Sequence, residues 1–220
     1  MARPEPGAAS SSPSARLLVQ SVRRSGTIGE RITVALSDGS SFSFTESSLR
    51  ESGVASLQLA VGAELSAEAV AALGELARAS AVHDRALRLL AAGSHTVRGL
   101  ELKLRARGAE PALVGAELAR LAASGLLDDG SYAASWVRQR LSRHPEGAGP
   151  LLAGLQRRGV PRELAEEAVR SQLTEEAERE AAAALAEKLR RRSGMTPERL
   201  QGLLGRRGFR RSVIREVLSG

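Results

Sequence analysis

A short sequence element occurs three times in this chain, around Gly108, Gly159 and Gly208. In each copy leucine stands eight and four positions before the glycine, and arginine stands immediately before it. Apolar residues recur from five positions after each glycine. Spacings of 51 and 49 residues between the glycines are typical of one supersecondary unit used in tandem. The repeat therefore restricts the chain to an array of similar units.

The spacing within one copy predicts two helices joined by a tight turn. Leucines four residues apart share one face of a helix. Glycine enters the left-handed backbone region without a steric penalty, so it ends that helix, and the later apolar residues mark a second one. The arginine either complements the negative end of the helix dipole or contacts a binding partner. We call the turn at each glycine an elbow, and we number the elbows 1 to 3 in chain order.

A further helical segment precedes each pair. Helical apolar spacing runs from the cap Ser66 to Gly93, as one long helix or two consecutive ones, and further helices begin at Asp128 or Asp129 and at Thr174. Pro197 suits the first helical position of the pair at elbow 3. The sequence thus predicts nine helices in three tandem modules that form an elongated, curved solenoid. The predicted modules are residues 66–126, 127–173 and 174–220.

The N-terminal part has different patterns. Residues 1–14 are rich in Pro, Ser and Ala and predict a disordered tail. Apolar residues alternate in Arg31–Leu36 and Ser41–Thr45 around an Asp-Gly turn, which predicts a β-hairpin. Leu17–Val22 and part of Leu57–Leu65 predict further strands. Residues 15–65 are therefore expected to form a small β-rich domain.

Charge is distributed unevenly along the chain. Residues 1–79 carry 7 Lys and Arg against 8 Asp and Glu, whereas residues 80–220 carry 25 against 17. The excess of positive charge in residues 80–220 favours a polyanionic or acidic partner at the repeats. The chain has no Cys, and its apolar runs are too short to span a membrane. We expect a cytoplasmic protein that makes no membrane contact.

The sequence predicts no enzyme site, metal site or cofactor site. The histidines have no spacing that suits a metal, and no phosphate-binding loop or nucleophile motif occurs. Asp128 and Asp129 form an acidic pair at a helix start, where a capping role is favoured over a metal or acid–base role. Trp136 shares a helix face with Tyr132, which favours core packing over binding.

The segment Gly125–Val137, with its Leu-Asp-Asp and its Tyr-Ala and Trp positions, resembles the signature of RecX regulatory proteins. The Arg-Arg-Gly sequences of elbows 2 and 3 and the segment Ala86–Ala91 are similar to further family motifs. The resemblance covers about residues 80–219, and the N-terminal hairpin resembles an extension of longer members. This chain departs from the pattern at His95-Thr96, Gly99 and Gly154. Glycine inside a helix costs about 1 kcal/mol relative to alanine, so we expect less stable helices there.

The resemblance implies a non-enzymatic monomer that binds the RecA–DNA filament. It implies inhibition of RecA ATPase, filament growth and strand exchange, and so regulation of recombinational repair and the SOS response. The alternatives are a DNA-binding protein without sequence preference and, from another class, a hydrolase or nuclease that uses the acidic pair Asp128 and Asp129. The basic residues expected to contact RecA or DNA are Lys103, Arg105, Arg107, Arg157, Arg158, Arg206, Arg207, Arg210 and Arg211.

Overall fold

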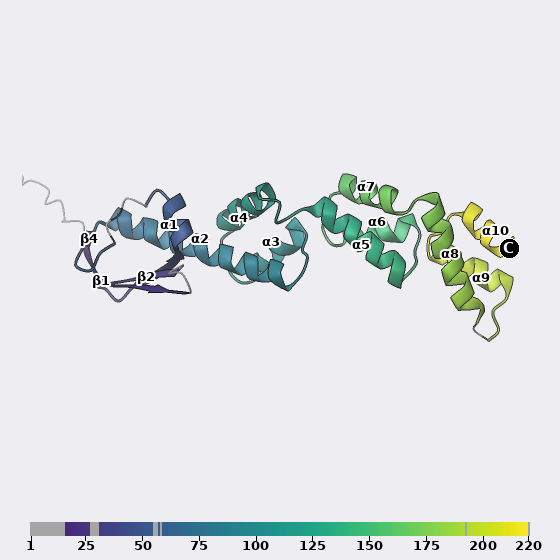
Figure 1. Ribbon diagram of the computed structural model, residues 1–220, viewed down its shortest axis with the longest axis horizontal. Helices are drawn as coiled ribbons and strands as arrows, with labels where there is room; N and C mark the ends of the chain where they lie inside the picture. Colours follow the sequence, from purple (N-terminus) through teal and green to yellow (C-terminus); the bar gives the residue numbers. More distant parts are fainter. Residues whose placement is uncertain (1–15, 27–30, 55–56, 58, 192, 220) are drawn as a thin grey trace, which may run out of the picture. The chain divides into compact units, whose positions relative to one another are not determined.

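The structure is a computed structural model that describes residues 16–26, 31–54, 57, 59–191 and 193–219. The tail predicted over residues 1–14 lies outside the described residues. The chain divides into two units, residues 1–84 and residues 85–220 (Figure 1).

Strands occur in the first unit, and helices make up most of the described chain. The strands are β1 (Leu17–Ser25), β2 (Arg31–Leu36), β3 (Ser41–Thr45) and β4 (Glu64–Leu65). The first five helices are α1 (Glu46–Glu51), α2 (Ala67–Ala92), α3 (Val97–Arg105), α4 (Pro111–Ala123) and α5 (Asp129–Arg143). The others are α6 (Ala148–Gln156), α7 (Arg162–Gln172), α8 (Glu175–Arg190), α9 (Pro197–Arg206) and α10 (Arg211–Ser219). The prediction of a mainly α chain behind a small β-rich region is confirmed.

The sheet is antiparallel, in the order β3-β2-β1-β4. The predicted hairpin is formed by β2 and β3, with Val34 opposite Phe42, and Gly39 turns the chain with a φ of 85°. Alternating residues of β2 are buried together with Phe44 and with Leu73 of α2. Helix α1 was not predicted, because its six residues bury no side chain and so leave no apolar period.

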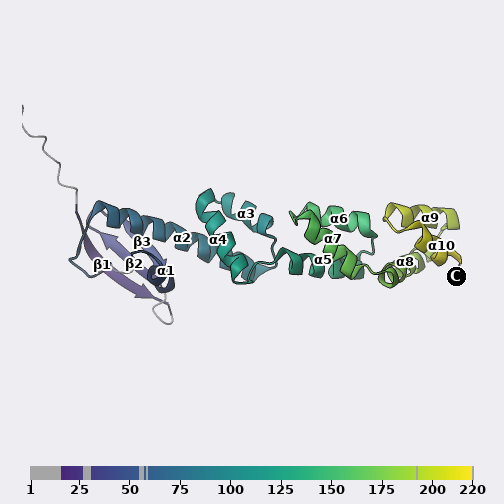
Figure 2. The same cartoon turned by 90° about the horizontal axis from the view of Figure 1, so that it is seen from above.

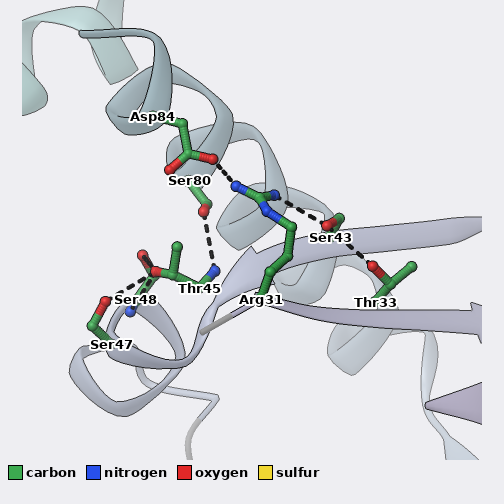
Figure 3. A network of polar contacts seen from close by, with 8 residues as sticks. All are labelled: Arg31, Thr33, Ser43, Thr45, Ser47, Ser48, Ser80 and Asp84. Carbon is green, nitrogen blue, oxygen red and sulfur yellow. Dashed lines mark hydrogen bonds and ion pairs between the residues drawn. The ribbon is translucent and has the colours of Figure 1, made fainter. Parts of the chain in front are cut away.

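A polar network fastens α2 to the strands of the first unit (Figure 3). Arg31 of β2 forms an ion pair with Asp84 of α2 and donates a hydrogen bond to Ser43 Oγ at 3.1 Å. The Ser80 hydroxyl accepts from the Thr45 backbone N at 3.2 Å. Ser80 is buried, so this bond satisfies a polar group that water does not reach.

The predicted nine helices of the modules correspond to α2–α10. Leu151, Leu155 and Val169 are buried in the core of the second module, and Leu200 and Leu204 in the core of the third. Figure 2 shows α3, α6 and α9 on one side of the second unit, with α5 and α8 on the other. Among the described helices, none is both long and apolar enough to cross a membrane.

The predicted caps begin the helices at the expected places. Asp128 Oδ1 accepts hydrogen bonds from the backbone N of Gly130 and of Ser131, at 2.8 and 3.1 Å. Thr174 and Thr196 cap α8 and α9 through their hydroxyl groups, and Pro197 is the first residue of α9. Such caps satisfy backbone donors that a helix leaves unpaired at its start.

Candidate functional site

The three elbows share one hydrogen-bonded turn. Gly108, Gly159 and Gly208 have φ values of 80°, 81° and 80°. In each elbow the residue after the glycine donates its backbone N–H to the carbonyl of the leucine four positions before the glycine, at 3.2 to 3.4 Å. The glycine itself donates to the carbonyl three positions before it, at 2.9 Å. These two bonds define a Schellman motif with glycine at the left-handed position, as the sequence predicts.

Elbow 2 lies against the start of α3 in the preceding module. The hydroxyl of Thr96, the N-cap of α3, donates to the carbonyl oxygen of Arg158 at 2.6 Å and is buried. A Cβ on Gly159 would overlap the side chain of Arg98. Asp129 Oδ1, at the start of α5, accepts from the Val97 backbone N at 2.8 Å. We call this contact junction 1.

Elbow 3 makes the corresponding contact with the start of α6. The backbone N of Gly147, the N-cap of α6, donates to the carbonyl oxygen of Arg207 at 2.8 Å. A Cβ on Gly208 would overlap the ring of Pro150, and one on Gly147 would overlap the backbone carbonyl of Gly208. We call this contact junction 2. In both junctions the carbonyl before the elbow glycine accepts from the cap residue of a helix in the preceding module.

Two of the arginines directly before an elbow glycine take part in these junctions and in the module cores. The Arg158 guanidinium lies over the Trp136 ring at 4.6 Å from its centroid, and its Nη1 donates to the Gly154 carbonyl at 2.9 Å. Arg207 forms an ion pair with Glu146 at 3.5 Å, and Arg140 holds the same carboxylate at 2.7 Å. A charge that stacks on an aromatic ring or pairs with a partly buried carboxylate stabilises the fold.

Arg210 also has a structural partner. Glu178 of α8 is 3% exposed, and it accepts from both the backbone N and the guanidinium of Arg210. This hydrogen bond, more than the accompanying charge attraction, raises the pKa of Arg210. The bond ties the start of α10 to α8, so reversal of this charge would leave a buried carboxylate unpaired.

The remaining predicted residues face solvent. Arg105 pairs with Glu101 at 2.8 Å, and Lys103 Nζ lies 3.5 Å from His95 Nε2. Burial and then the Lys103 charge lower the pKa of His95, so this imidazole is neutral at pH 7. Four predicted arginines are exposed and form no ion pair or hydrogen bond with the described residues. We call them the free elbow arginines: Arg107, Arg157, Arg206 and Arg211.

Sequence reasoning missed Glu146 and Glu178, and it placed Asp129 at a helix start without its contact to the preceding module. Glu146 precedes the α6 cap by one residue, Glu178 lies in α8, and Asp129 reaches α3. Each is less than a tenth exposed. An acidic side chain in a polar stretch carries no period that separates it from a solvated one, so the sequence holds no usable signal for them.

Both carboxylates of the acidic pair at the start of α5 accept hydrogen bonds from backbone N–H groups at helix starts. Hydrogen bonds from the Ser131 hydroxyl and from backbone N–H groups hold the pKa of Asp128 below its usual range. Burial raises the pKa of Asp129, and the hydrogen bond from Val97 opposes this rise. The described residues contain no group of His, Cys, Asp or Glu side chains that suits a metal ion.

Asp129 offers a test of junction 1. Substitution Asp129→Ala is expected to lower the free energy of unfolding by about 1–3 kcal/mol, because the partly buried backbone N–H of Val97 loses its acceptor. Asp129→Asn keeps an acceptor oxygen and is expected to stay within about 1 kcal/mol of the parent at pH 7. The raised pKa means that this carboxyl contributes stability below its ordinary pKa, which is lost as the pH rises through the raised value. Urea unfolding across this pH range measures these effects. Asp129→Asn should abolish the part of the pH dependence of stability that comes from residue 129.

Comparisons with known proteins give a consistent result. Residues 128–169 match a family model described as RecX, second three-helix domain. Regulatory protein RecX of Treponema pallidum (strain Nichols) is 38% identical over 134 residues, which cover 61% of this chain and 81% of the relative. Regulatory protein RecX of Mycolicibacterium smegmatis is 37% identical over 142 residues, which cover 60% and 75%.

Solved structures share the fold. A crystal structure of a regulatory protein RecX superposes with a TM-score of 0.74 at 25% identity and covers 93% of this chain and 100% of that chain. The crystal structure of RecX from Lactobacillus salivarius superposes with a TM-score of 0.60 at 24% identity, over 64% of this chain and 95% of that chain. The second likeness concerns the fold alone.

Proposed function

Because this chain belongs to the RecX family of regulatory proteins, we propose that it binds the RecA–DNA filament and inhibits it. Inhibition would act on the RecA ATPase, on filament growth and on strand exchange. The protein would thereby regulate recombinational DNA repair and the SOS response. We assign it no catalytic residue and no cofactor, and we place its action in the cytoplasm.

The free elbow arginines carry the proposal. All four belong to the second unit, where α3, α6 and α9 lie on one side (Figure 2), and three of them stand at the C-terminal ends of these helices. Their guanidinium groups are exposed and have no carboxylate partner among the described residues. Such groups are available to DNA phosphates or to acidic protein surface. Several weak contacts along one filament reinforce one another through effective concentration, so no deep pocket is required.

The DNA-dependent ATPase of the cognate RecA tests the proposal directly. Titration with this protein is expected to lower the steady-state ATPase rate at ratios up to one protein per RecA protomer. A parallel titration with heat-denatured protein controls for added salt and non-specific charge. An unchanged rate over this range contradicts the proposal.

The competing function is sequence-independent binding to DNA itself, and the same exposed arginines favour it. Contacts to four phosphates predict that the logarithm of the binding constant falls with log salt at a slope of about −3.6, or roughly 100-fold between 50 and 200 mM. Binding to naked single- and double-stranded DNA should be measured beside binding to assembled filaments. An affinity for filaments that never exceeds the affinity for naked DNA selects this alternative.

A further inference from the structure

The contact between neighbouring modules is built twice from corresponding parts. In junctions 1 and 2, an elbow glycine lies against the first turn of the second helix of the preceding module. The carbonyl of the arginine before that glycine accepts a hydrogen bond from the cap residue, which is Thr96 in one case and Gly147 in the other. The acceptor carbonyl is equivalent in the two junctions, whereas the donor is the Thr96 hydroxyl in one and the Gly147 backbone N in the other. The elbow and the helix start therefore meet at the same place twice, which makes them complementary surfaces.

One copy of each surface is left over in the described chain. A Cβ on Gly108 of elbow 1 would meet no atom within 4 Å, whereas one on either other elbow glycine would overlap a neighbouring side chain. Arg107 is exposed. At the start of α9, the cap residue Thr196 is exposed, although the same residue type at position 96 is 3% exposed under elbow 2. Elbow 1 and the start of α9 are thus the two unpaired halves of the junction.

Each half carries one charged side chain that can pair with the other half. In junction 2 the elbow arginine, Arg207, pairs with Glu146, which lies next to the α6 cap. Arg107 holds the same position in elbow 1 and has no ion pair with the described residues. Glu198 lies two residues after the α9 cap and is exposed, and no ion pair with it is found among the described residues. Glu146 precedes its cap and Glu198 follows its cap, so an Arg107–Glu198 contact would join the same two charge types as junction 2, with the carboxylate on the other side of the cap.

We propose that elbow 1 of one copy of this chain docks on the start of α9 of a second copy. The Thr196 hydroxyl interacts with the Glu198 carboxylate within one chain. In the docked pair this hydroxyl turns to the carbonyl oxygen of Arg107, and Glu198 pairs with the Arg107 guanidinium instead. The two surfaces differ, so the contact is heterologous and each added copy exposes both surfaces again. The internal junctions gain from effective concentration and this one does not, so head-to-tail chains form only at high protein concentration. The monomer expected from the sequence is the state at low concentration.

A charge swap between the two surfaces tests the proposal on the full-length chain. The variants are Arg107→Glu, Glu198→Arg and an equimolar mixture of the two, and the readout is the weight-average mass from sedimentation or light scattering. The mass of the parent protein is expected to rise with concentration. Each variant alone is expected to dissociate at least about tenfold more readily, because like charges then face each other. The mixture is expected to recover the mass of the parent, because each contact again joins opposite charges.

Arg23→Glu makes the same charge change on an exposed arginine in the first unit and serves as the matched control. Its association should equal that of the parent, and circular dichroism should confirm equal helix content in every variant. A parent protein that stays monomeric at all concentrations overturns the proposal. Association that both variants retain, or a mixture that fails to regain mass, overturns it as well.

Discussion

Substitution Gly147→Ala is expected to lower the free energy of unfolding by about 2–4 kcal/mol and to separate the second and third modules. The added Cβ would overlap the carbonyl group of Gly208, which is backbone and has no rotamer to change. The backbone of Gly147 is extended, with φ at −79°, so alanine introduces no strain of its own. The loss therefore measures the close contact of junction 2.

Gly149→Ala is the matched control for this prediction. Gly149 lies in the first turn of α6, and a Cβ there would meet nothing within 4 Å. This variant is expected to be neutral or to gain up to about 1 kcal/mol from helix propensity. Urea unfolding followed by circular dichroism gives the stability. Hydrogen exchange at the backbone N–H of residue 147, which donates to the Arg207 carbonyl, reports whether the junction opens. Equal stability of the two variants would show that the modules do not depend on this contact.

The elbows could be predicted because everything that makes them is local. The leucines, the glycine and the cap residues of one elbow lie within about one helix length of each other. The same pattern in three copies strengthens the prediction. The junctions could not be predicted, because Thr96 and the carbonyl of Arg158 stand 62 positions apart. The periodicity of a helix shows which of its faces is buried. It does not show which elbow packs against the first turn of which helix. The module bounds at residues 66, 127 and 174 remain predictions.

Gly154 shows how a local rule can mislead. The sequence predicts that this glycine weakens its helix, because glycine is a poor helix former. In the structure a Cβ at this position would overlap the Trp136 ring, and the Gly154 carbonyl accepts from Arg158. The absence of a side chain thus lets Trp136 pack on α6, where the Arg158 guanidinium lies over its ring. A departure from the family pattern reflects a packing requirement between α5 and α6.

The nine basic residues predicted from the sequence form groups with different environments. Arg206 and Arg207 carry the same charge at adjacent positions at the end of α9, and the sequence offers no means to distinguish their roles. A neighbouring carboxylate determines which of the two arginines has a structural role. Glu146 forms an ion pair with Arg207, whereas Arg206 has no such partner among the described residues. A charge reversal that tests binding should therefore spare Arg158, Arg207 and Arg210.

Reversal of the four free elbow arginines is expected to weaken inhibition of RecA by roughly 30- to 1000-fold. The variant combines Arg107→Glu, Arg157→Glu, Arg206→Glu and Arg211→Glu. An exposed charge contact contributes about 0.5–1 kcal/mol, so four of them contribute about 2–4 kcal/mol, and 1.4 kcal/mol corresponds to tenfold. The side chains are exposed, so helix content and unfolding midpoint should change little. The measurement is the protein concentration that halves the RecA ATPase rate at fixed salt.

A second fourfold variant separates the elbows from net charge. Arg23, Arg50, Arg78 and Arg88 are exposed and form no ion pair with the described residues, and none belongs to an elbow. Their reversal changes the net charge of the chain by the same amount, so long-range steering toward a polyanion weakens equally in both variants. Inhibition by this second variant should therefore remain within a fewfold of the parent. Equal losses in the two variants would mean that overall charge, and not the elbows, holds the chain on the filament.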